Sequence, residues 1–292
     1  MTAAAIFNKL LGLSSAGFYF RKGAFMDKLI ITNCAADTSM HPEVPARLAR
    51  SDALAASVEP AARAGAAIVH IHAPPTDYGA WESHTKAIRD RCDIMIQYGI
   101  STQTVEQRKA VVKNRPEMMS VALGAHNLAF TGRDLMMLHP RAELAELMRL
   151  CRDNGVKPEF EVFSLGDIWL LQDLISKDLV SAPYLMTPFF GRPGGTWSPA
   201  TMNEFLNRIA GLPKNSFYAT SVTGPSHLLL ESMAVMSGGH VRVGTEDEPY
   251  LRPGVLGDNA DHVARIARIA KEFGREVATV NEARAMLNIP RR

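Results

Sequence analysis

Short apolar segments rich in β-branched residues alternate with longer segments of helical periodicity along most of this 292-residue chain. The short segments have the length and composition of buried strands, and there are eight of them. The predicted strands are Leu29–Thr32, Ala67–His72, Ile94–Tyr98, Met118–Leu123, Glu159–Phe163, Tyr184–Pro188, Phe217–Val222 and His240–Val243.

A helical pattern follows each predicted strand. Two of the helices end at glycine, Gly65 and Gly155, which is a common stop signal. The predicted helices are Asp52–Ala64, Glu82–Arg91, Thr104–Val112, Arg141–Asn154, Gly166–Ser176, Pro199–Ile209, Pro225–Met236 and Ala260–Phe273, with an extra terminal helix at Thr279–Leu287. In this last helix Thr279 and Glu282 have the spacing of a capping box.

The order of these elements predicts the fold. Strands joined by connections too long for hairpins form a parallel sheet, and eight such units in roughly 260 residues fit a (β/α)8 TIM barrel. A doubly wound open sheet is the alternative, although no GxGxxG follows the first strand. We therefore expect an α/β chain in which residues 26–292 form one barrel catalytic domain.

Residues 1–25 are predicted to be an N-terminal extension. Asn8 and Lys9 interrupt their apolar stretch, and Arg21 and Lys22 close it. A secretory signal has its charges first and then an uninterrupted apolar centre, so this is not its pattern. We interpret the segment as a loosely attached extension or the product of an upstream start codon. A short amphipathic helix used in oligomer contacts is the alternative.

Composition and charge exclude several classes of protein. The net charge is +2 and the basic residues are scattered among acids, which gives no reason to expect nucleic acid as a partner. Cys34, Cys92 and Cys151 are widely spaced and form no CxxC, so we expect a reducing compartment, the cytoplasm, and no disulfide framework. No apolar run approaches the roughly 18 residues that span a bilayer, so we expect no membrane association.

Two histidines at the end of the second predicted strand suggest a metal site. His70 and His72 are two residues apart, so in a strand both imidazoles point to the same side. Glu246, after the last predicted strand, could supply a third ligand across the fold. Two histidines and a carboxylate suit catalytic Zn²⁺ or another divalent transition metal. The alternative is a pair of half-buried strand histidines with backbone partners.

Polar residues follow strand after strand, at the end where a TIM barrel has its active site. These residues are Asn33, Asp37, His70, His72, Ser101, Thr102, His126, Asn127, Glu161, Ser164, Thr223, His227, Arg242, Glu246 and Asp247. Arg242 is costly to bury without a partner, and near a metal it could hold a substrate carboxylate or Asp247. Ser101 and Thr102 could bind a carboxylate or cap the next helix.

These pieces together resemble a known family, the β-keto acid cleavage enzymes. The resemblance runs from Lys28 to the C-terminus. The stretches that carry it are Ala64–His72 with its His-x-His, Pro158–Phe163, the Gly191–Gly195 loop, Gly238–Asp247 with the pattern GGHxRxGxED, and Ala264–Arg275.

The resemblance implies a (β/α)8 barrel that binds Zn²⁺ and is commonly a homotetramer. It also implies an acyltransferase reaction in which a β-keto acid and acetyl-CoA give acetoacetate and a new acyl-CoA. In the family, the positions of His70, His72 and Glu246 hold the metal. Those of Arg242 and Asp247 form a catalytic pair, with an acidic neighbour that Glu161 matches.

Substrate contacts are expected from further positions. The resemblance implies that Ser101 helps to bind the substrate carboxylate, and Thr102 is a second donor next to it. Backbone amides of the Gly191–Gly195 loop, which includes Gly194 and Gly195, could stabilise charge on oxygen.

Four places depart from the family pattern. Asp37 stands in a loop where a glutamate is usual, and Asn127 stands where a small hydroxyl residue is usual. The loop that ends at His227 lacks the usual arginine, and Glu248-Pro249 replaces an asparagine. Either Asp37 takes the catalytic place of the glutamate or that role is lost. We expect Asn127 and His227 to contact a substrate other than the aminohexanoate of the family's namesake.

Two other functions stay open from the residues alone. The same metal could serve an aldolase or hydrolase that acts on a keto acid without CoA. The chain could also be an inactive barrel that binds a small acid, because a fold does not guarantee a function.

Overall fold

A computed structural model describes residues 27–35, 41, 43–44, 50–74, 77–130, 133–191 and 196–291. The predicted extension 1–25 lies outside the described residues, so the division into extension and barrel domain stays a prediction. Asp37, Gly194 and Gly195 also lie outside them.

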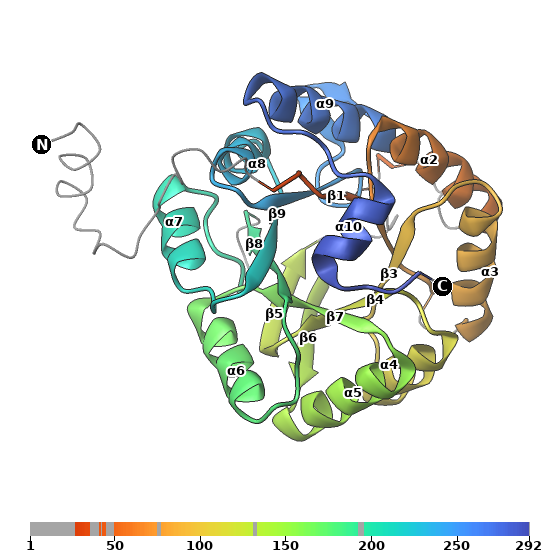
Figure 1. Cartoon of the computed structure of the whole chain (residues 1–292), viewed down its shortest axis with the longest axis vertical. Helices are drawn as coiled ribbons and strands as arrows, with labels where there is room; N and C mark the ends of the chain where they lie inside the picture. Colours follow the sequence, from red (N-terminus) through yellow and green to blue (C-terminus); the bar gives the residue numbers. More distant parts are fainter. Residues whose placement is uncertain are drawn as a thin grey trace, which may run out of the picture.

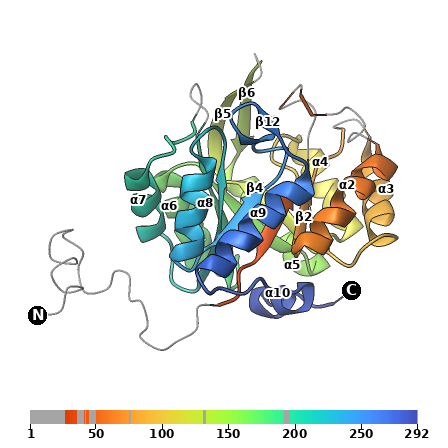
Figure 2. The ribbon, with the colours of Figure 1, turned by 90° about the horizontal axis from the view of Figure 1, so that it is seen from above.

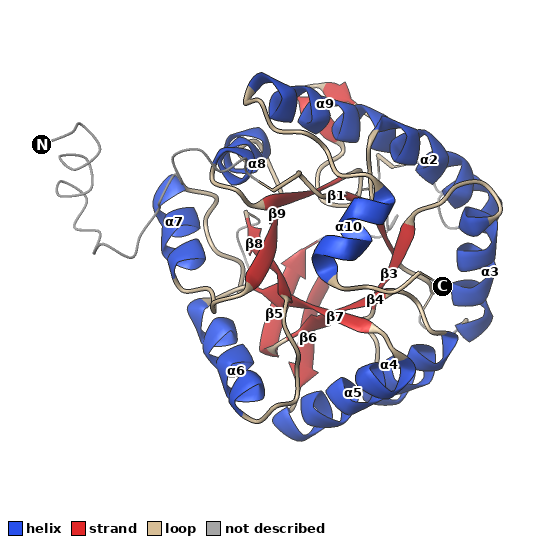
Figure 3. Ribbon diagram, in the orientation of Figure 1, coloured by secondary structure: helices blue, strands red, loops and turns tan. Residues whose placement is uncertain are grey.

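Eight parallel strands close into a barrel in the order β1-β10-β9-β8-β7-β4-β3-β2, which confirms the predicted fold (Figures 1 and 3). The barrel strands are β1 (Ile31–Cys34), β2 (Ile68–Ile71), β3 (Met95–Gly99), β4 (Met118–Ala122), β7 (Lys157–Val162), β8 (Tyr184–Phe190), β9 (Ser216–Val222) and β10 (His240–Val243). Every predicted strand is present; His240–Val243 has the predicted ends, and the other strands have at least one shifted end. The first begins two residues later than predicted, because Leu29 makes only an isolated bridge to Val277.

Helices surround the barrel and pack their apolar faces on it (Figure 1). They are α2 (Ser51–Ala64), α3 (Tyr78–Arg89), α4 (Val105–Val111), α5 (Arg141–Asn154), α6 (Leu165–Ser176), α7 (Met202–Ala210), α8 (His227–Met236), α9 (Asn259–Glu272) and α10 (Val280–Leu287), with a 3₁₀ turn η2 (Val112–Asn114). The predicted capping box of Thr279 and Glu282 is present at the start of α10.

The extra helix α10 covers the end of the barrel where the strands begin. Its Ala283 and Leu287 are fully buried and pack in one cluster with strand residues such as Ile68 and Met95. Figure 2 shows α10 at the end of the barrel opposite to β5 and β6. Because α10 covers this end, the functional groups of the barrel are left to the other end.

Two hairpins are additions that we did not predict. Strands β5 (Gly124–Phe130) and β6 (Arg133–His139) form an antiparallel pair between β4 and α5, and β11 (Tyr250–Arg252) pairs with β12 (Val255–Leu256). Phe130 pairs directly with Arg133, so two residues connect β5 and β6. The dipeptide Thr131-Gly132 between these runs is not one of the pairs that usually signal a two-residue hairpin. Figure 2 shows the β5–β6 hairpin rising above the barrel.

Candidate metal and substrate site

The two histidines of β2 and the distant Glu246 meet at the carboxyl end of the barrel. His70 Nε2 lies 3.1 Å from His72 Nε2, and His72 Nε2 lies 3.1 Å from Glu246 Oε1. The third edge of this triangle, from His70 Nε2 to Glu246 Oε1, measures 3.7 Å. His70 and Glu246 are buried. The structure thus brings together the three predicted ligands, although residues 70 and 246 are 176 positions apart in the sequence.

This triangle has the dimensions that a zinc ion requires. Metal–ligand distances of about 2.0–2.1 Å place neighbouring donors of a tetrahedral site about 3.3 Å apart. The other oxygen of Glu246, Oε2, is buried and has no hydrogen-bond partner among the described residues. A buried carboxylate oxygen without a partner is costly, and a cation would satisfy it. The donor set therefore fits a divalent ion.

A hydrogen bond sets the orientation of His70. The carbonyl Oε1 of Gln97 lies 2.7 Å from His70 Nδ1, so Nδ1 carries the proton and Nε2 keeps a lone pair for a metal. Gln97 Nε2 donates in turn to Glu159 Oε2 at 3.4 Å. Burial, followed by the nearby charge of Arg242, holds the pKa of His70 well below its ordinary value. The ring is therefore neutral, as a metal ligand must be.

Gly99, the last residue of β3, is a functional position that the sequence analysis missed. A Cβ atom at residue 99 would lie 2.3 Å from His72 Cε1 and 2.6 Å from His70 Nε2. Such contacts are far inside van der Waals distance, so only glycine leaves room for both imidazoles. The requirement comes from a neighbouring strand, and nothing in the local sequence around residue 99 signals it.

Arg242 and Asp247 form a buried ion pair beside the three donors. Arg242 Nε and Nη2 donate to the two carboxylate oxygens of Asp247 at 2.9 and 3.0 Å, and Nη2 also donates to Glu246 at 3.0 Å. Ser221 Oγ donates to Asp247 at 2.9 Å. Burial acts to lower the pKa of Arg242, but the charges of Asp247, Cys34 and Glu246 outweigh it and hold the pKa above its ordinary value. The predicted catalytic pair is thus in contact.

The serine and the acidic neighbour predicted for the substrate side also meet. Ser101 Oγ donates to Glu161 Oε2 at 2.6 Å, and both side chains are buried. Thr102 is exposed. Helix α4 is capped by Thr104, so the capping role considered for Ser101 and Thr102 belongs to a different residue.

Asn127 and His227 have different surroundings. Asn127 lies in β5, and its Oδ1 is buried without a hydrogen-bond partner in the described part of the chain. His227 begins α8, where Nδ1 lies 3.0 Å from the carbonyl of Gly224 and Nε2 lies 2.9 Å from Arg265 Nη2. Both ring nitrogens of His227 are therefore engaged by the protein, whereas Asn127 has an acceptor available.

Glu248, which departs from the family pattern, ties two loops together. Its carboxylate accepts from the backbone nitrogen of Gly224 at 2.8 Å and from that of Tyr250 at 3.0 Å. The first bond reaches the loop after β9, and the second lies just past Asp247 in the chain. Glu248 thereby helps to fix the segment that carries Glu246 and Asp247.

Aromatic rings line the part of the mouth that lies across the barrel from the histidines. His126 lies 4.4 Å from Phe163, and Phe163 stacks on Phe189 at 4.9 Å, both measured between ring centroids. The guanidinium carbon of Arg242 lies 5.1 Å from the Phe189 centroid. Trp197 packs edge-on against both phenylalanines. A continuous series of contacts therefore joins hairpin residue His126 to Arg242.

Cys34 lies close to two of the predicted metal ligands, and the sequence analysis did not include it among the site residues. One ligand atom each of Cys34, His70 and Glu246 lie within 4.8 Å of one another, and all three residues are buried. Cys34 ends β1, next to β2. A sulfur atom thus lies beside the predicted metal ligands.

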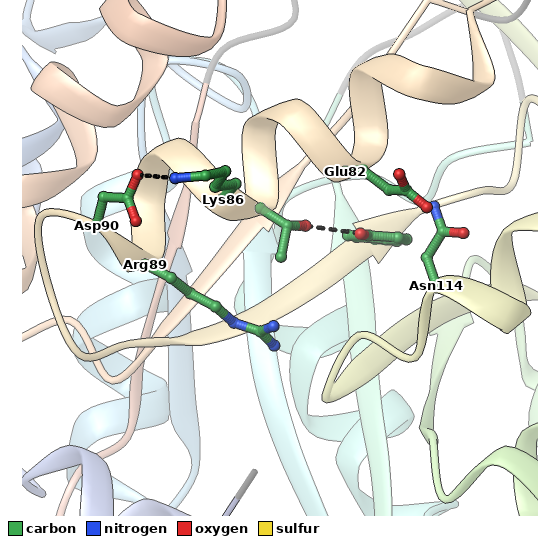
Figure 4. Close-up of a pocket in the computed structure, with 7 residues that line it drawn as sticks. Glu82, Lys86, Arg89, Asp90 and Asn114 are labelled. Carbon is green, nitrogen blue, oxygen red and sulfur yellow. Dashed lines mark hydrogen bonds and ion pairs between the residues drawn. The ribbon is translucent and has the colours of Figure 1, made fainter.

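A surface recess lies elsewhere, on the helix side of the barrel wall (Figure 4). It is lined by Glu82, Thr85, Lys86, Arg89, Asp90, Tyr98 and Asn114. Lys86 is paired with Asp90, and Thr85 is hydrogen-bonded to Tyr98. None of the predicted site residues lines this recess.

A family model described as beta-keto acid cleavage enzyme matches residues 28–289 of this chain. The chain belongs to this family. The predicted enzyme class, an acyltransferase that acts on β-keto acids, is thereby confirmed.

Family relatives differ in the compounds that their names give. A 3-keto-5-aminohexanoate cleavage enzyme from Acetoanaerobium sticklandii is 33% identical and covers 90% of this chain and 99% of its own length. A 3-dehydrocarnitine:acetyl-CoA trimethylamine transferase from Rhizobium meliloti is 27% identical, over 82% of this chain and 89% of its own. A 3,5-dioxohexanoate:acetyl-CoA acetone transferase from Paraburkholderia graminis is also 27% identical, over 90% and 96%.

Solved structures support the same fold. ObcA in a binary complex with oxaloacetate superposes with a TM-score of 0.68 at 16% identity, covering 83% of this chain and 67% of that chain. At this identity the likeness concerns the fold alone.

No helix in the described ranges has the length and apolar character needed to cross a membrane.

Proposed function

We propose that this enzyme exchanges acyl groups between a β-keto acid and acetyl-CoA, giving acetoacetate and a new acyl-CoA, with a divalent metal held by His70, His72 and Glu246. One observation carries the proposal. The triangle of metal donors shares a hydrogen bond with the Arg242–Asp247 pair, through Arg242 Nη2 and Glu246 Oε1. Family membership and the relatives named for acetyl-CoA transfer support the same reaction.

The metal is proposed to be Zn²⁺ or another divalent transition ion, on the basis of the nitrogen and oxygen donors. When bound, it supplies Lewis acidity toward the keto oxygen of the substrate. His70 is held by Gln97 with its Nε2 lone pair available, and Glu246 is oriented by Arg242. These contacts pre-orient the ligands, which is the usual purpose of hydrogen bonds behind a metal site.

Asp247 is the proposed proton acceptor. A β-keto acid loses a proton from the carbon between its two carbonyl groups, and a positioned carboxylate can accept it. Arg242 and Ser221 fix both oxygens of Asp247, so the carboxylate cannot turn away from the substrate. Arg242 Nη1 is buried without a hydrogen-bond partner among the described residues, which leaves a donor for a substrate oxygen.

The remaining site residues are proposed to bind and orient the substrate. Ser101 and Thr102 are proposed to bind the substrate carboxylate, for which the Ser101 hydroxyl would have to release Glu161, to which it now donates at 2.6 Å. Asn127 Oδ1, which has no hydrogen-bond partner among the described residues, is proposed as an acceptor for a polar group of the acyl part. Proposed roles for Asp37, Gly194, Gly195 and His227 rest on the sequence.

The test is an assay of purified protein with a panel of β-keto acids plus acetyl-CoA, with metal content measured on the same sample. We expect acetoacetate and an equal amount of a new acyl-CoA from at least one substrate. Carbon–carbon cleavage that proceeds equally well without acetyl-CoA would instead support an aldolase or hydrolase. Metal-loaded protein that turns over none of the panel, yet is stabilised by carboxylic acids, would support the small-acid-binding alternative.

Assembly and location stay proposals that rest on sequence. A homotetramer follows from the resemblance alone and is tested by light scattering on the purified chain. A cytoplasmic location rests on the cysteine pattern, and all three cysteines are free. Fractionation of the source cells tests it.

A further inference from the structure

Cys34 has a place in the barrel mouth that the proposed function does not use. Its ligand atom, one of His70 and one of Glu246 lie within 4.8 Å of one another, at the ends of neighbouring strands. The Cys34 side chain is fully buried and the cysteine is free. Burial raises the pKa of the Cys34 thiol well above its ordinary value, and the charges of Arg242, Asp247 and Glu246 also act on it.

The backbone fixes the sulfur relative to two metal donors. Cys34 pairs in register with His70 across the β1–β2 ladder, and the amide of Ala35 donates to the carbonyl of His70 at 3.1 Å. On the other side, the Cys34 carbonyl accepts from the backbone nitrogen of Glu246 at 3.4 Å. Cys34 is therefore bound directly to the segments that carry both donors.

Residue 244 allows this close approach. A Cβ atom at Gly244 would lie 2.2 Å from the Cys34 carbonyl oxygen, and the φ angle of Gly244 is 152°. Only glycine tolerates both conditions. The segment leading to Glu246 consequently passes directly over the end of β1.

A second observation indicates that a cation belongs at this point. Glu246 is 3% exposed, and its Oε2 has no hydrogen-bond partner in the described part of the chain. The cluster thus combines a buried unsatisfied carboxylate oxygen, an imidazole with an available lone pair and a sulfur atom. Sulfur, nitrogen and oxygen donors together are a ligand set for soft or borderline divalent ions.

We propose that Cys34 Sγ is an additional donor to the metal that His70, His72 and Glu246 hold. This inference rests on the metal site of the proposed function. Zinc–sulfur distances of about 2.3 Å place a sulfur about 3.6 Å from a neighbouring nitrogen donor. The ligand atoms of Cys34, His70 and Glu246 already lie within 4.8 Å of one another. The thiol proton is released when the sulfur binds, as for any coordinated cysteine.

The sulfur donor has a consequence for the choice of metal. Thiolate favours Zn²⁺, Co²⁺ and similar ions over Mg²⁺ or Mn²⁺, which prefer oxygen. Two histidines and a carboxylate already favour transition ions over Mg²⁺, and a thiolate donor strengthens that preference. Zinc sites accept a fifth ligand, so the additional donor does not exclude a substrate.

Cobalt substitution tests the inference directly. The metal-free full-length protein is loaded with Co²⁺, and absorption spectra are recorded for the wild type, Cys34→Ala, Cys34→Ser and Cys151→Ala. Cys151 is the matched control because it is also fully buried, in α5. We expect the near-ultraviolet sulfur-to-cobalt band in the wild type and in Cys151→Ala, and its absence in both Cys34 variants.

The visible cobalt bands show whether metal is bound in each sample. Visible bands in the wild type without the near-ultraviolet band would overturn the proposal, as would an unchanged near-ultraviolet band in Cys34→Ala. Competition with a chelator adds a second measurement. We expect Cys34→Ala to bind Zn²⁺ at least about 10-fold more weakly while its Mg²⁺ affinity is unchanged.

Failure here is separable from failure of the proposed function. Acetoacetate formation by the wild type, measured with Zn²⁺ bound, tests the reaction whatever the cobalt spectra show. A wild type that binds no Co²⁺ and no Zn²⁺ would overturn both the sulfur donor and the metal site. Thermal unfolding of each variant shows whether Cys34→Ala is folded. If Cys34→Ala is not folded, Cys34→Ser serves in its place, because a serine side chain has nearly the same volume as cysteine.

Discussion

On one side of the barrel mouth, β1, β2, β3 and β10 present nitrogen, oxygen and sulfur donors, whereas β7 and β8 across the barrel present aromatic rings. We call these the metal half and the aromatic half. In the metal half, hydrogen bonds of 2.7–3.1 Å link almost every group to the next. In the aromatic half, Phe163, Phe189 and Trp197 are held by ring contacts.

The difference concerns what each half can tolerate. A metal site requires donors at fixed distances, so each residue type is tightly constrained. Ring packing requires volume and shape, and other apolar residues can supply them at modest cost. We therefore expect substitutions in the metal half to abolish activity, and those in the aromatic half to alter it.

The largest effect is expected from the metal donors. His70→Ala and Glu246→Gln should each lose most of the bound metal and nearly all activity, because a donor of the triangle is removed. Elemental analysis of purified protein measures this. His84→Ala is the control, since His84 is buried in α3 and bonded to Ser51. Full metal occupancy in both donor variants would refute the ligand assignment.

Asp247→Asn should lower kcat by about 10²–10⁴-fold while the metal stays bound, because an amide cannot accept the proton. Steady-state kinetics with the best substrate of the panel, together with metal content, measure this. A kcat within a few-fold of the wild type would show that the proton goes to another group. Ser221→Ala, which removes one hydrogen bond to Asp247, should have a smaller effect in the same direction.

Gly99→Ala should weaken metal binding because the new methyl group occupies the space of His70 and His72. We expect a loss of about 10–100-fold in Zn²⁺ affinity, as for other disturbances around a metal site. Gly79→Ala in α3 is the matched control, since its Cβ would meet only an Asp77 oxygen at 3.4 Å. Equal Zn²⁺ affinity in both variants would contradict the assigned role of Gly99.

Phe189→Leu tests whether the aromatic half acts on the metal half. Loss of the ring beside Arg242 removes an interaction worth about 0.5–1 kcal/mol, so kcat should fall about 2–5-fold with metal retained. Phe205→Leu is the control, since Phe205 is a buried ring of α7 outside the barrel. If both variants lower kcat equally, the effect is one of general stability.

Glu159 links the two halves because it accepts a hydrogen bond from Gln97. We expect a substitution of Glu159 to change only the free energy of unfolding. Burial, followed by the charge of Glu161, raises the pKa of Glu159 to about 8. The pKa of Glu159 is higher in the folded than in the unfolded protein. The contribution of Glu159 to the free energy of unfolding is therefore fully present below about pH 4.5 and is lost as the pH rises through about 8.

Glu159→Gln keeps the shape of the protonated acid and cannot ionise. Relative to the wild type, the variant should gain on the order of 1–3 kcal/mol between pH 5 and pH 9. Urea unfolding at the two pH values measures this. A pH dependence identical to that of the wild type would mean that Glu159 is ionised in the native protein at neutral pH.

The sequence predicted the barrel because strand and helix periods are local signals. The β5–β6 hairpin was missed because its strands, GAHNLAF and RDLMMLH, do not alternate apolar and polar residues, and because an interruption between β4 and α5 breaks the expected order of elements. The strand β1 was placed two residues early because apolar composition does not show where a ladder ends.

The site residues also divide into those with a local sequence signal and those without one. His70 and His72 lie two residues apart, and Arg242, Glu246 and Asp247 lie within one short segment, so the pattern of each group was readable. Gly99, Cys34 and Phe189 have roles only through contacts with other strands. No spacing along the chain carries that information.

The ends of the β5–β6 hairpin lie side by side, because Gly124 pairs with His139. Strand β4 ends at Ala122 and α5 begins at Arg141, so the hairpin enters and leaves the barrel at one point. Insertions with adjacent ends are the ones that a scaffold tolerates best. Evolution can therefore exchange this hairpin, with His126 and Asn127 on it, as a unit while the strands that carry His70 and Arg242 stay unchanged.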